Sequence, residues 1–333
     1  MVWHLPMTAE NPLATPDWFP LSLDHERGTL VFVQMTRETF RQSAFHHAAI
    51  IRAGDKTLKA PVDKLTGVRP GVPSHFILHT AFCGSTLLAR YLENLPRCFV
   101  LKEPGLLTQL GAIPYGDAWP DWFETSLSLL GRAYPSDAAT IIKLHDVCNW
   151  MGGPILDRDR GTRIVFLYNP LRTHLLQILK DRGRRRDVHQ HVRSQPMALL
   201  PALAEAVRDP LTDAQCAAAM WLLNAHLCDC LLARPDRARV LVMNGRDVIA
   251  DPQRAVTRTM EHFGLVDDAI RVALAALRPA ESHAKDQGAA YDGAARDAAL
   301  SAAERDHGAE IEAGIAWARQ ICPDLTGMNE FPR

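Results

Sequence analysis

The feature that most constrains the fold is the segment Ile77–Leu88, whose sequence is ILHTAFCGSTLL. An apolar strand pattern runs into a small-residue turn, and a helix pattern begins at once. The first turn of a helix has unpaired N–H donors and a partial positive charge, so this arrangement favours a bound phosphate or sulfate. The hydroxyls of Ser85 and Thr86 would face the same point. The segment is not a Walker A loop, because the lysine of G-x-x-x-x-G-K-[ST] is missing.

Composition narrows the class of protein. The chain has 333 residues, of which 47% are hydrophobic, enough for one large domain with additions or for two domains. Its net charge of −1 argues against a general nucleic-acid surface. We expect a cytoplasmic protein that binds no membrane, because the start lacks signal-peptide features and no apolar run reaches the ~18 residues of a membrane helix. The seven scattered cysteines show no C-x-x-C pair, which favours reduced thiols over a zinc site.

The chain divides near residue 70. Residues 1–70 predict a small N-terminal extension rich in β structure, and 71–333 predict the main α/β domain. Within the extension we expect an irregular arm over 1–27, a strand over 29–35, a short helix over 37–45, a hairpin of 48–51 with 57–60 around Gly54, and a linker from residue 61.

From residue 74 onward, strand and helix patterns alternate. Continuous apolar strands of this kind favour a central parallel sheet flanked by helices on both faces. Ligands of such sheets lie at the carboxyl ends of the strands. The predicted strands are 75–80, 98–101, 140–144, 163–168 and 239–243, and the predicted helices are 85–95, 118–133, 170–182, 211–234, 252–264, 266–278 and 294–320. The segments 105–135 and 183–210 are expected to be inserts that help to form a pocket.

Polar residues follow the ends of the predicted strands. Glu103, His145 and Arg172 follow three of them, and Lys143 lies inside an apolar strand. A lysine there must reach a partner or a ligand, because an unpaired buried charge is costly. This set of residues fits the transfer of an anionic group to a nucleophile, which needs charge stabilisation and a base. Two structural roles stay open: Glu103 could cap the next helix, and His145 could be a buried, hydrogen-bonded residue.

Three stretches resemble the sulfotransferase superfamily, whose members use 3′-phosphoadenosine 5′-phosphosulfate (PAPS). FCGSTL at 82–87 is similar to the 5′-phosphosulfate loop, [KR]-[ST]-G-[ST]-T. IIKLH at 141–145 is similar to the segment I-K-T-H, whose histidine is the catalytic base. VLVMNGRDVIADP at 240–252 is similar to a late strand followed by E-D-L-x-x-D-P. The resemblance covers roughly 75–265 and implies a sulfotransferase-like fold.

The resemblance also implies a reaction and a set of site residues. The reaction is the transfer of a sulfuryl group from PAPS to a hydroxyl or amine of a small molecule or peptide. His145 would be the base, with Glu103 as the alternative, and Lys143, helped by Lys102, would offset charge on the bridging oxygen. The residues implied to bind PAPS are Cys83, Gly84, Ser85, Thr86, Leu87, Asn169 and Arg172.

Three departures from the family pattern keep other functions open. Phe82 stands where the loop normally has Lys or Arg, and Tyr168 and Leu176 replace an arginine and a serine of the 3′-phosphate site. The chain could therefore keep the fold and act as a binding or partner protein without catalysis. A third reading is an ATP-dependent phosphotransferase, with Asp146 or Asp247 as the magnesium ligand.

Other cations could replace the missing phosphate ligands. Lys102, Lys143 and Arg172 are the nearest in the predicted scheme. Lys180 and the basic run 182–186 lie farther along; the run reads as a solvated surface that could also clamp a phosphate or an acidic substrate. The sequence HQH at 189–191 reads as a surface loop.

Overall fold

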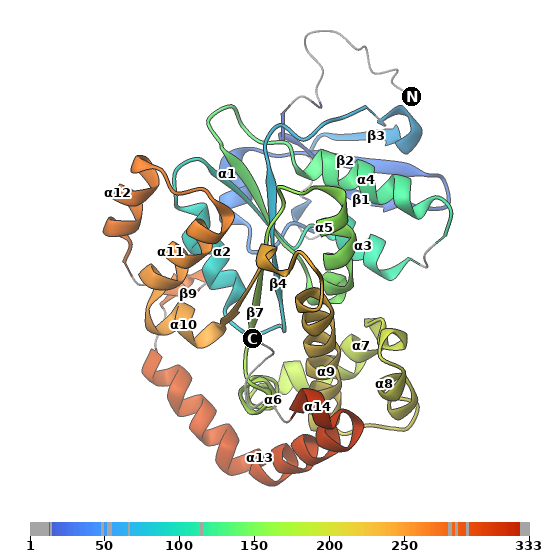
Figure 1. Ribbon diagram of the computed structural model, residues 1–333, viewed down its shortest axis with the longest axis vertical. Coiled ribbons are helices and arrows are strands. Elements are labelled where there is room, and N and C mark those ends of the chain that lie inside the picture. The colour runs from blue at the N-terminus through green and yellow to red at the C-terminus, as the bar shows by residue number, and fades with distance from the viewer. Residues whose placement is uncertain are drawn as a thin grey trace.

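The computed structural model describes residues 13, 15–47, 50–51, 55–65, 67–113, 116–278, 282–283, 286–290 and 293–326. At its centre is a five-stranded parallel sheet with the strand order β5-β6-β4-β7-β8 (Figure 1). All five predicted strands are confirmed to within one residue at each end. They are β4 (Ser74–His79), β5 (Cys98–Lys102), β6 (Ala139–Lys143), β7 (Ile164–Tyr168) and β8 (Val240–Asn244).

Helices cover both faces of the sheet, as the continuous apolar strands predict. Alternate side chains of a strand point to opposite faces, so Ile77 packs in one hydrophobic cluster while Phe76 and Leu78 pack in the other. The cluster around Ile77 is completed by α2 (Ser85–Glu93), α11 (Pro252–Phe263) and α12 (Asp268–Ala276). The other face is covered by α3 (Gly105–Ala112), α4 (Trp119–Leu130), α5 (Gly152–Arg158) and α9 (Asp213–Leu232).

The second half of the chain adds a helical layer at the carboxyl ends of the strands. The long helix α13 curves along the bottom of Figure 1 and packs against α6 and α9. The expected insert 183–210 is largely helical and contains most of α7 and all of α8. The remaining elements are α6 (Leu171–Leu179), α7 (Arg182–Ser194), α8 (Pro201–Ala206), α10 (Gly245–Ala250), α13 (Gly293–Ile321), α14 (Pro323–Thr326), β9 (Ser282–His283) and β10 (Asp286–Ala290).

The N-terminal extension forms an antiparallel sheet in the order β1-β2-β3. Its elements are β1 (Trp18–Asp24), β2 (Thr29–Gln34), α1 (Arg37–Gln42) and β3 (Thr57–Pro61). The prediction of an irregular arm is wrong for β1, where Phe19, Leu21 and Leu23 alternate into the core. The predicted hairpin is also wrong, because β3 pairs with β2; residues 48–49 and 52–54 of that hairpin lie outside the described residues.

A buried arginine attaches this extension to the main sheet. The Arg132 guanidinium donates hydrogen bonds to the carbonyls of Leu13 (2.8 Å), Thr15 (2.9 Å) and Trp18 (2.6 Å). Burial lowers its pKa to about 10. Because a buried guanidinium without acceptors would be costly, this residue holds the carbonyls of Leu13, Thr15 and Trp18 in place. Among the described helices, none is both long and apolar enough to cross a bilayer.

Candidate anion-binding and transfer site

A cavity of about 980 Å³ lies at the carboxyl ends of the strands. The loops after β4, β5, β6 and β7 line it, together with residues of α6, α7 and α13 and of the N-terminal extension. The position agrees with the rule for open parallel sheets, whose ligands bind beyond the carboxyl ends. Nine of the ten residues expected in the site line this cavity, and Arg172 does not.

The loop between β4 and α2 lines the cavity. Ala81, Phe82 and Gly84 all have positive φ angles, of 56°, 49° and 90°. This backbone turns the chain so that α2 begins at Ser85 beside the cavity. In the described part of the chain, the N–H groups of Gly84 and Thr86 find no acceptor. They are therefore available to an oxyanion at the positive end of the helix.

Neighbouring residues hold this loop in shape. His79 accepts a hydrogen bond from Ala81 N–H at Nδ1 (3.0 Å), and its Nε2 lies 2.9 Å from the carbonyl of Leu144. Burial lowers the pKa of His79, which keeps the ring neutral and suits it to one donor and one acceptor role. Directly after β7, the Asn169 amide donates to the carbonyl of Phe82 (3.1 Å). Asn169 thus contributes to the site by holding the loop in place.

Gly245 presses against the same loop from the other side. A Cβ atom at this position would lie 1.9 Å from the Cys83 carbonyl oxygen. No side chain fits there unless the loop moves. The first residue of α10 must therefore be glycine for the loop to keep its present place.

Lys143 and Glu103 form an ion pair at the cavity. The Lys143 ammonium is almost fully buried and donates to the Glu103 carboxylate. The ring of Phe45, from the extension, lies 5.4 Å from the ammonium nitrogen. Burial opposes the ionised form of Glu103, but the charge of Lys143, together with His79 and His145, outweighs burial and leaves the Glu103 pKa below its ordinary value. Glu103 is therefore an ionised partner of Lys143.

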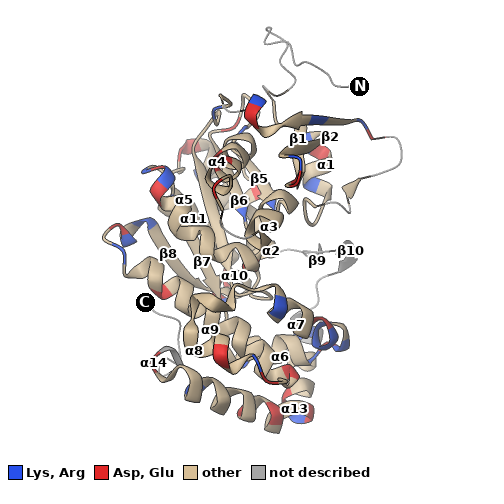
Figure 2. Cartoon of the chain, turned by 90° about the vertical axis from the view of Figure 1, so that its right-hand side faces the viewer, with Lys and Arg blue, Asp and Glu red and all other residues tan. Residues whose placement is uncertain are grey.

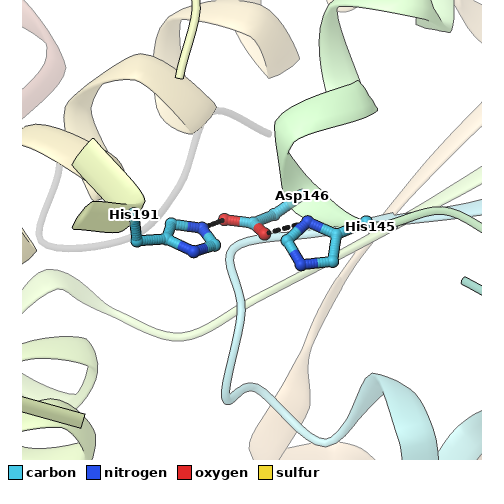
Figure 3. Close-up of side chains that lie close together, drawn as sticks. All are labelled: His145, Asp146 and His191. Carbon is cyan, nitrogen blue, oxygen red and sulfur yellow. Dashed lines mark hydrogen bonds and ion pairs between the residues drawn. The ribbon is translucent and has the colours of Figure 1, made fainter. Parts of the chain in front are cut away.

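A hydrogen-bonded group of His145, Asp146 and His191 lies on the same cavity (Figure 3). One oxygen of the buried Asp146 carboxylate is 2.9 Å from His145 Nδ1, and the other is 2.8 Å from His191 Nε2. Gln195 adds a hydrogen bond to the second oxygen (3.0 Å). The described bond at Nδ1 assigns the proton of neutral His145 to that nitrogen, so Nε2 carries the basic lone pair.

The charges within this group support each other. Burial disfavours the Asp146 carboxylate, but the charge of His191 and the hydrogen bonds from both rings hold its pKa well below the ordinary value. For His145, burial acts against the charged ring, yet the hydrogen bond and charge of Asp146 raise its pKa above 6.5. His145 is thus oriented and made more basic, which are the properties of a general base.

The same three residues are the candidates for a metal ion among the described residues. Their ligand atoms lie within 4.8 Å of one another. However, the two oxygens of Asp146 are bonded to different imidazoles. The group is therefore complete as a hydrogen-bonded network.

Three further cations line the cavity: Lys180 at the end of α6, Arg184 on α7 and Arg296 on α13. Burial, and then the charges of Arg184 and Arg296, lower the Lys180 pKa to about 8. In the described residues, neither Lys180 nor Arg184 has a carboxylate within ion-pair distance, while Arg296 meets Asp297 at 3.1 Å. This part of the cavity therefore carries positive charge that a bound anion can neutralise.

Two expected cations are not in the site. Lys102 is fully buried and donates to Glu93 (2.6 Å), so it does not line the cavity. Arg172 is paired with Glu304 and Glu312 of α13 and does not line the cavity either. In both cases a carboxylate outside the expected site pairs with the cation: Glu93 lies nine residues before Lys102, whereas Glu304 and Glu312 come from α13.

Sequence reasoning missed the contribution of α7. The sequence places Arg184 in a basic run that reads as solvated, with a phosphate clamp as the alternative, and His191 in a surface loop, and it gives Gln195 no role. All three contact site residues. Their spacing offers a signal, because positions 184, 188, 191 and 195 share one face of a helix. Val188, within that series, is buried.

No family model and no curated protein matches this sequence. The structure is similar to solved sulfotransferases. One from Alicyclobacillus acidocaldarius is 16% identical over 78% of this chain and 99% of that chain, with a TM-score of 0.42. STF1 from Mycobacterium tuberculosis is 13% identical over 64% and 73% (TM-score 0.40), and mouse SULT7A1 complexed with PAP is 13% identical over 65% and 68% (TM-score 0.35). At these values no functional property is carried over to this chain.

Proposed function

We propose that this protein transfers a sulfuryl group from PAPS to a hydroxyl or amine of a small molecule or peptide. The observation that carries the proposal is that the amide donors of the loop at Gly84 and the oriented imidazole of His145 line one cavity. The first group suits an oxyanion and the second suits a proton. Sulfuryl transfer needs both at neighbouring places.

In the proposed reaction, the loop around Gly84 holds the 5′-phosphosulfate. The acceptor oxygen or nitrogen attacks sulfur, the bond from sulfur to the bridging oxygen breaks, and the phosphate leaves with the electron pair. His145 Nε2 takes the proton of the acceptor. Lys143, fixed by Glu103 and by the Phe45 ring, lies at the same cavity and contributes positive charge.

His145 is preferred over Glu103 as the base. A base working near neutral pH needs a pKa near that pH. The pKa of Glu103 is held below its ordinary value and its carboxylate is bound by Lys143, whereas the pKa of His145 is raised above 6.5. Glu103 is thus assigned to holding Lys143.

The phosphotransferase reading has less support. Its magnesium ligand would be Asp146 or Asp247. Both oxygens of Asp146 are bonded to imidazoles, and Asp247 is exposed and faces Arg258 at 3.9 Å. Neither carboxylate is placed as a free ligand for a metal bound to ATP.

The test has two measurements. Turnover is measured with sulfur-labelled PAPS and a panel of alcohols, phenols, amines and tyrosine peptides, and binding of the product nucleotide PAP is measured by calorimetry. We expect turnover with at least one acceptor, and a His145→Gln variant that binds PAP normally but turns over at least ~100-fold more slowly. Binding of PAP without turnover by any acceptor favours the non-catalytic reading. Absence of both, or stabilisation only by ATP with magnesium, contradicts the proposal.

A further inference from the structure

The leaving phosphate in sulfuryl transfer gains negative charge as its bond to sulfur breaks. Groups aimed at such charge make the largest contributions to catalysis. The loop offers neutral amides and hydroxyls, and Phe82 brings no charge at the position before Cys83. The Lys143 ammonium is already paired with Glu103. The site therefore gains from a cation that no carboxylate neutralises.

Arg184 fits this requirement in position and in charge. Its guanidinium carbon lies 4.3 Å from the centre of the Phe82 ring, the distance of a cation–π contact. It donates to the carbonyl of Gln177 (2.6 Å), and in the described part of the chain no carboxylate lies within ion-pair distance of it. Phe82 and Arg184 both line the cavity. The Phe82 ring carries no charge, but it holds the positive charge of Arg184 beside the loop.

Helix α7 holds this guanidinium in a fixed place. The side chain of Asp181 caps the helix by accepting from the Arg184 N–H (2.9 Å), and Val188 and Val192 are buried along the same helix. Two turns after Arg184, His191 bonds to Asp146 (2.8 Å). The helix is therefore tied to the cavity at both places, and the guanidinium is positioned before any ligand binds.

We propose that Arg184 is a catalytic residue: stacked on Phe82, it stabilises the negative charge that develops on the leaving phosphate. The inference rests on the proposed function. It assigns to the pair Phe82 and Arg184, which lie about 100 residues apart in the chain, the role of a single cationic residue in the loop. The nearby charges of Lys180 and Arg296 then serve the rest of the nucleotide.

The experiment compares Arg184→Gln with a control, Arg186→Gln. The control removes an exposed arginine of the same helix, whose ion pair in the described part of the chain is with its neighbour Asp187. We expect Arg184→Gln to lower kcat by ~100- to 1000-fold, the usual effect of removing one stabilising donor, with a much smaller change in the Kd of PAP. The control should retain kcat and Kd. Thermal unfolding of each variant checks that the fold is intact.

Moving the charge back into the loop gives a second, independent readout. In Phe82→Lys/Arg184→Gln, a loop lysine replaces the lost guanidinium, and we expect kcat to recover at least 10-fold over Arg184→Gln. Retention of kcat in Arg184→Gln, or a loss confined to PAP affinity, overturns the assignment while leaving the proposed function in place. A parent protein without PAPS turnover overturns both.

Discussion

Lys102 and Lys143 are direct neighbours in the central sheet, at the ends of β5 and β6. Both are almost fully buried, and both are paired with a glutamate. They nevertheless belong to different parts of the molecule. The ammonium of Lys102 is enclosed by Glu93 and by the carbonyl of Phe40 (3.0 Å), whereas that of Lys143 lies at the cavity.

What surrounds each lysine decides its role. Lys102 links the extension to the main sheet, since its ammonium contacts Phe40 and its backbone N–H donates to His46 (3.0 Å). Lys143 has Glu103 on one side and the Phe45 ring on the other, and the rest of its surroundings is the cavity. The surroundings of a lysine at the end of a strand therefore decide its role. Lys102 is covered by the extension and has a structural role, whereas Lys143 faces the cavity and is a candidate for catalysis.

The largest expected effect is on stability, in Lys102→Met. This change leaves Glu93 buried without its closest partner, and breaking such a pair typically costs about 3–5 kcal/mol. Urea unfolding of the parent and the variant measures the loss. Lys102→Met/Glu93→Gln should recover part of it, because the uncompensated charge is gone. A loss below about 1 kcal/mol would show that Lys102 contributes little to stability, and would contradict the structural role assigned to it here.

Lys143→Met should act on catalysis first. We expect kcat to fall by about 100- to 1000-fold, as for other groups that stabilise charge in a transition state. The loss of stability should be smaller than in Lys102→Met, because the cavity lets Glu103 recruit water. Steady-state kinetics and urea unfolding on the same preparations separate the two effects. Equal stability losses in both variants would argue that the two lysines play one structural role.

Gly245→Ala tests whether the cavity that Lys143 lines also depends on the loop between β4 and α2. The added methyl would lie 1.9 Å from the Cys83 carbonyl oxygen, so the loop must shift. A displacement of about 1 Å in such a site can cost roughly 100-fold in rate. We expect weaker PAP binding and lower kcat by calorimetry and kinetics, with both lysine pairs untouched. Unchanged PAP affinity would show that the loop does not hold the nucleotide.

The two sides should also differ in their response to acid. On the Lys102 side, burial and then the charge of Lys102 lower the pKa of His46 to about 3. Between pH 6.5 and about 3, His46 is protonated in the unfolded chain but not in the folded chain. The free energy of unfolding therefore decreases as the pH is lowered, by about 1.4 kcal/mol per pH unit for this group. His46→Gln should flatten that slope in urea unfolding series. A slope unchanged in the variant would assign the acid sensitivity elsewhere.

On the Lys143 side, activity should be lost before structure. The pKa of His145 is raised above 6.5, and the protonated ring cannot accept the acceptor's proton. The rate should therefore fall as the pH drops through a value above 6.5, where the fold is still intact. A pH profile of kcat beside far-UV circular dichroism measures both. A rate that stays flat down to pH 6 would speak against His145 as the base.

The sequence was a good guide wherever one local pattern decides the structure. Continuous apolar strands and the glycine turn predict β4, α2 and their junction at Gly84, because strand period and helix start are local properties. The strand order β5-β6-β4-β7-β8 and the ion-pair partner of each cation depend on the tertiary structure, so no local pattern predicts them. Lys102 and Arg172 read as site residues until Glu93 and Glu304 are seen to hold them.

The contribution of α7 shows the other limit of sequence reasoning. A run of five residues with four arginines is expected to be exposed to solvent. Arg182 and Arg186 are exposed, as expected. Only the packing of Val188 against the core turns one arginine of the run toward Phe82 and places His191 on Asp146. Charge density alone could not distinguish them.

Of the seven cysteines, Cys230 is exposed and the other six are buried. Cys83, inside the loop, has its thiol pKa raised to about 11 by burial. Thiol-directed reagents should therefore modify the wild-type chain at a single place on α9, without prior removal of the others. A fluorophore or spin label attached there offers a ready reporter of motions around the helical layer, with the chemistry left undisturbed.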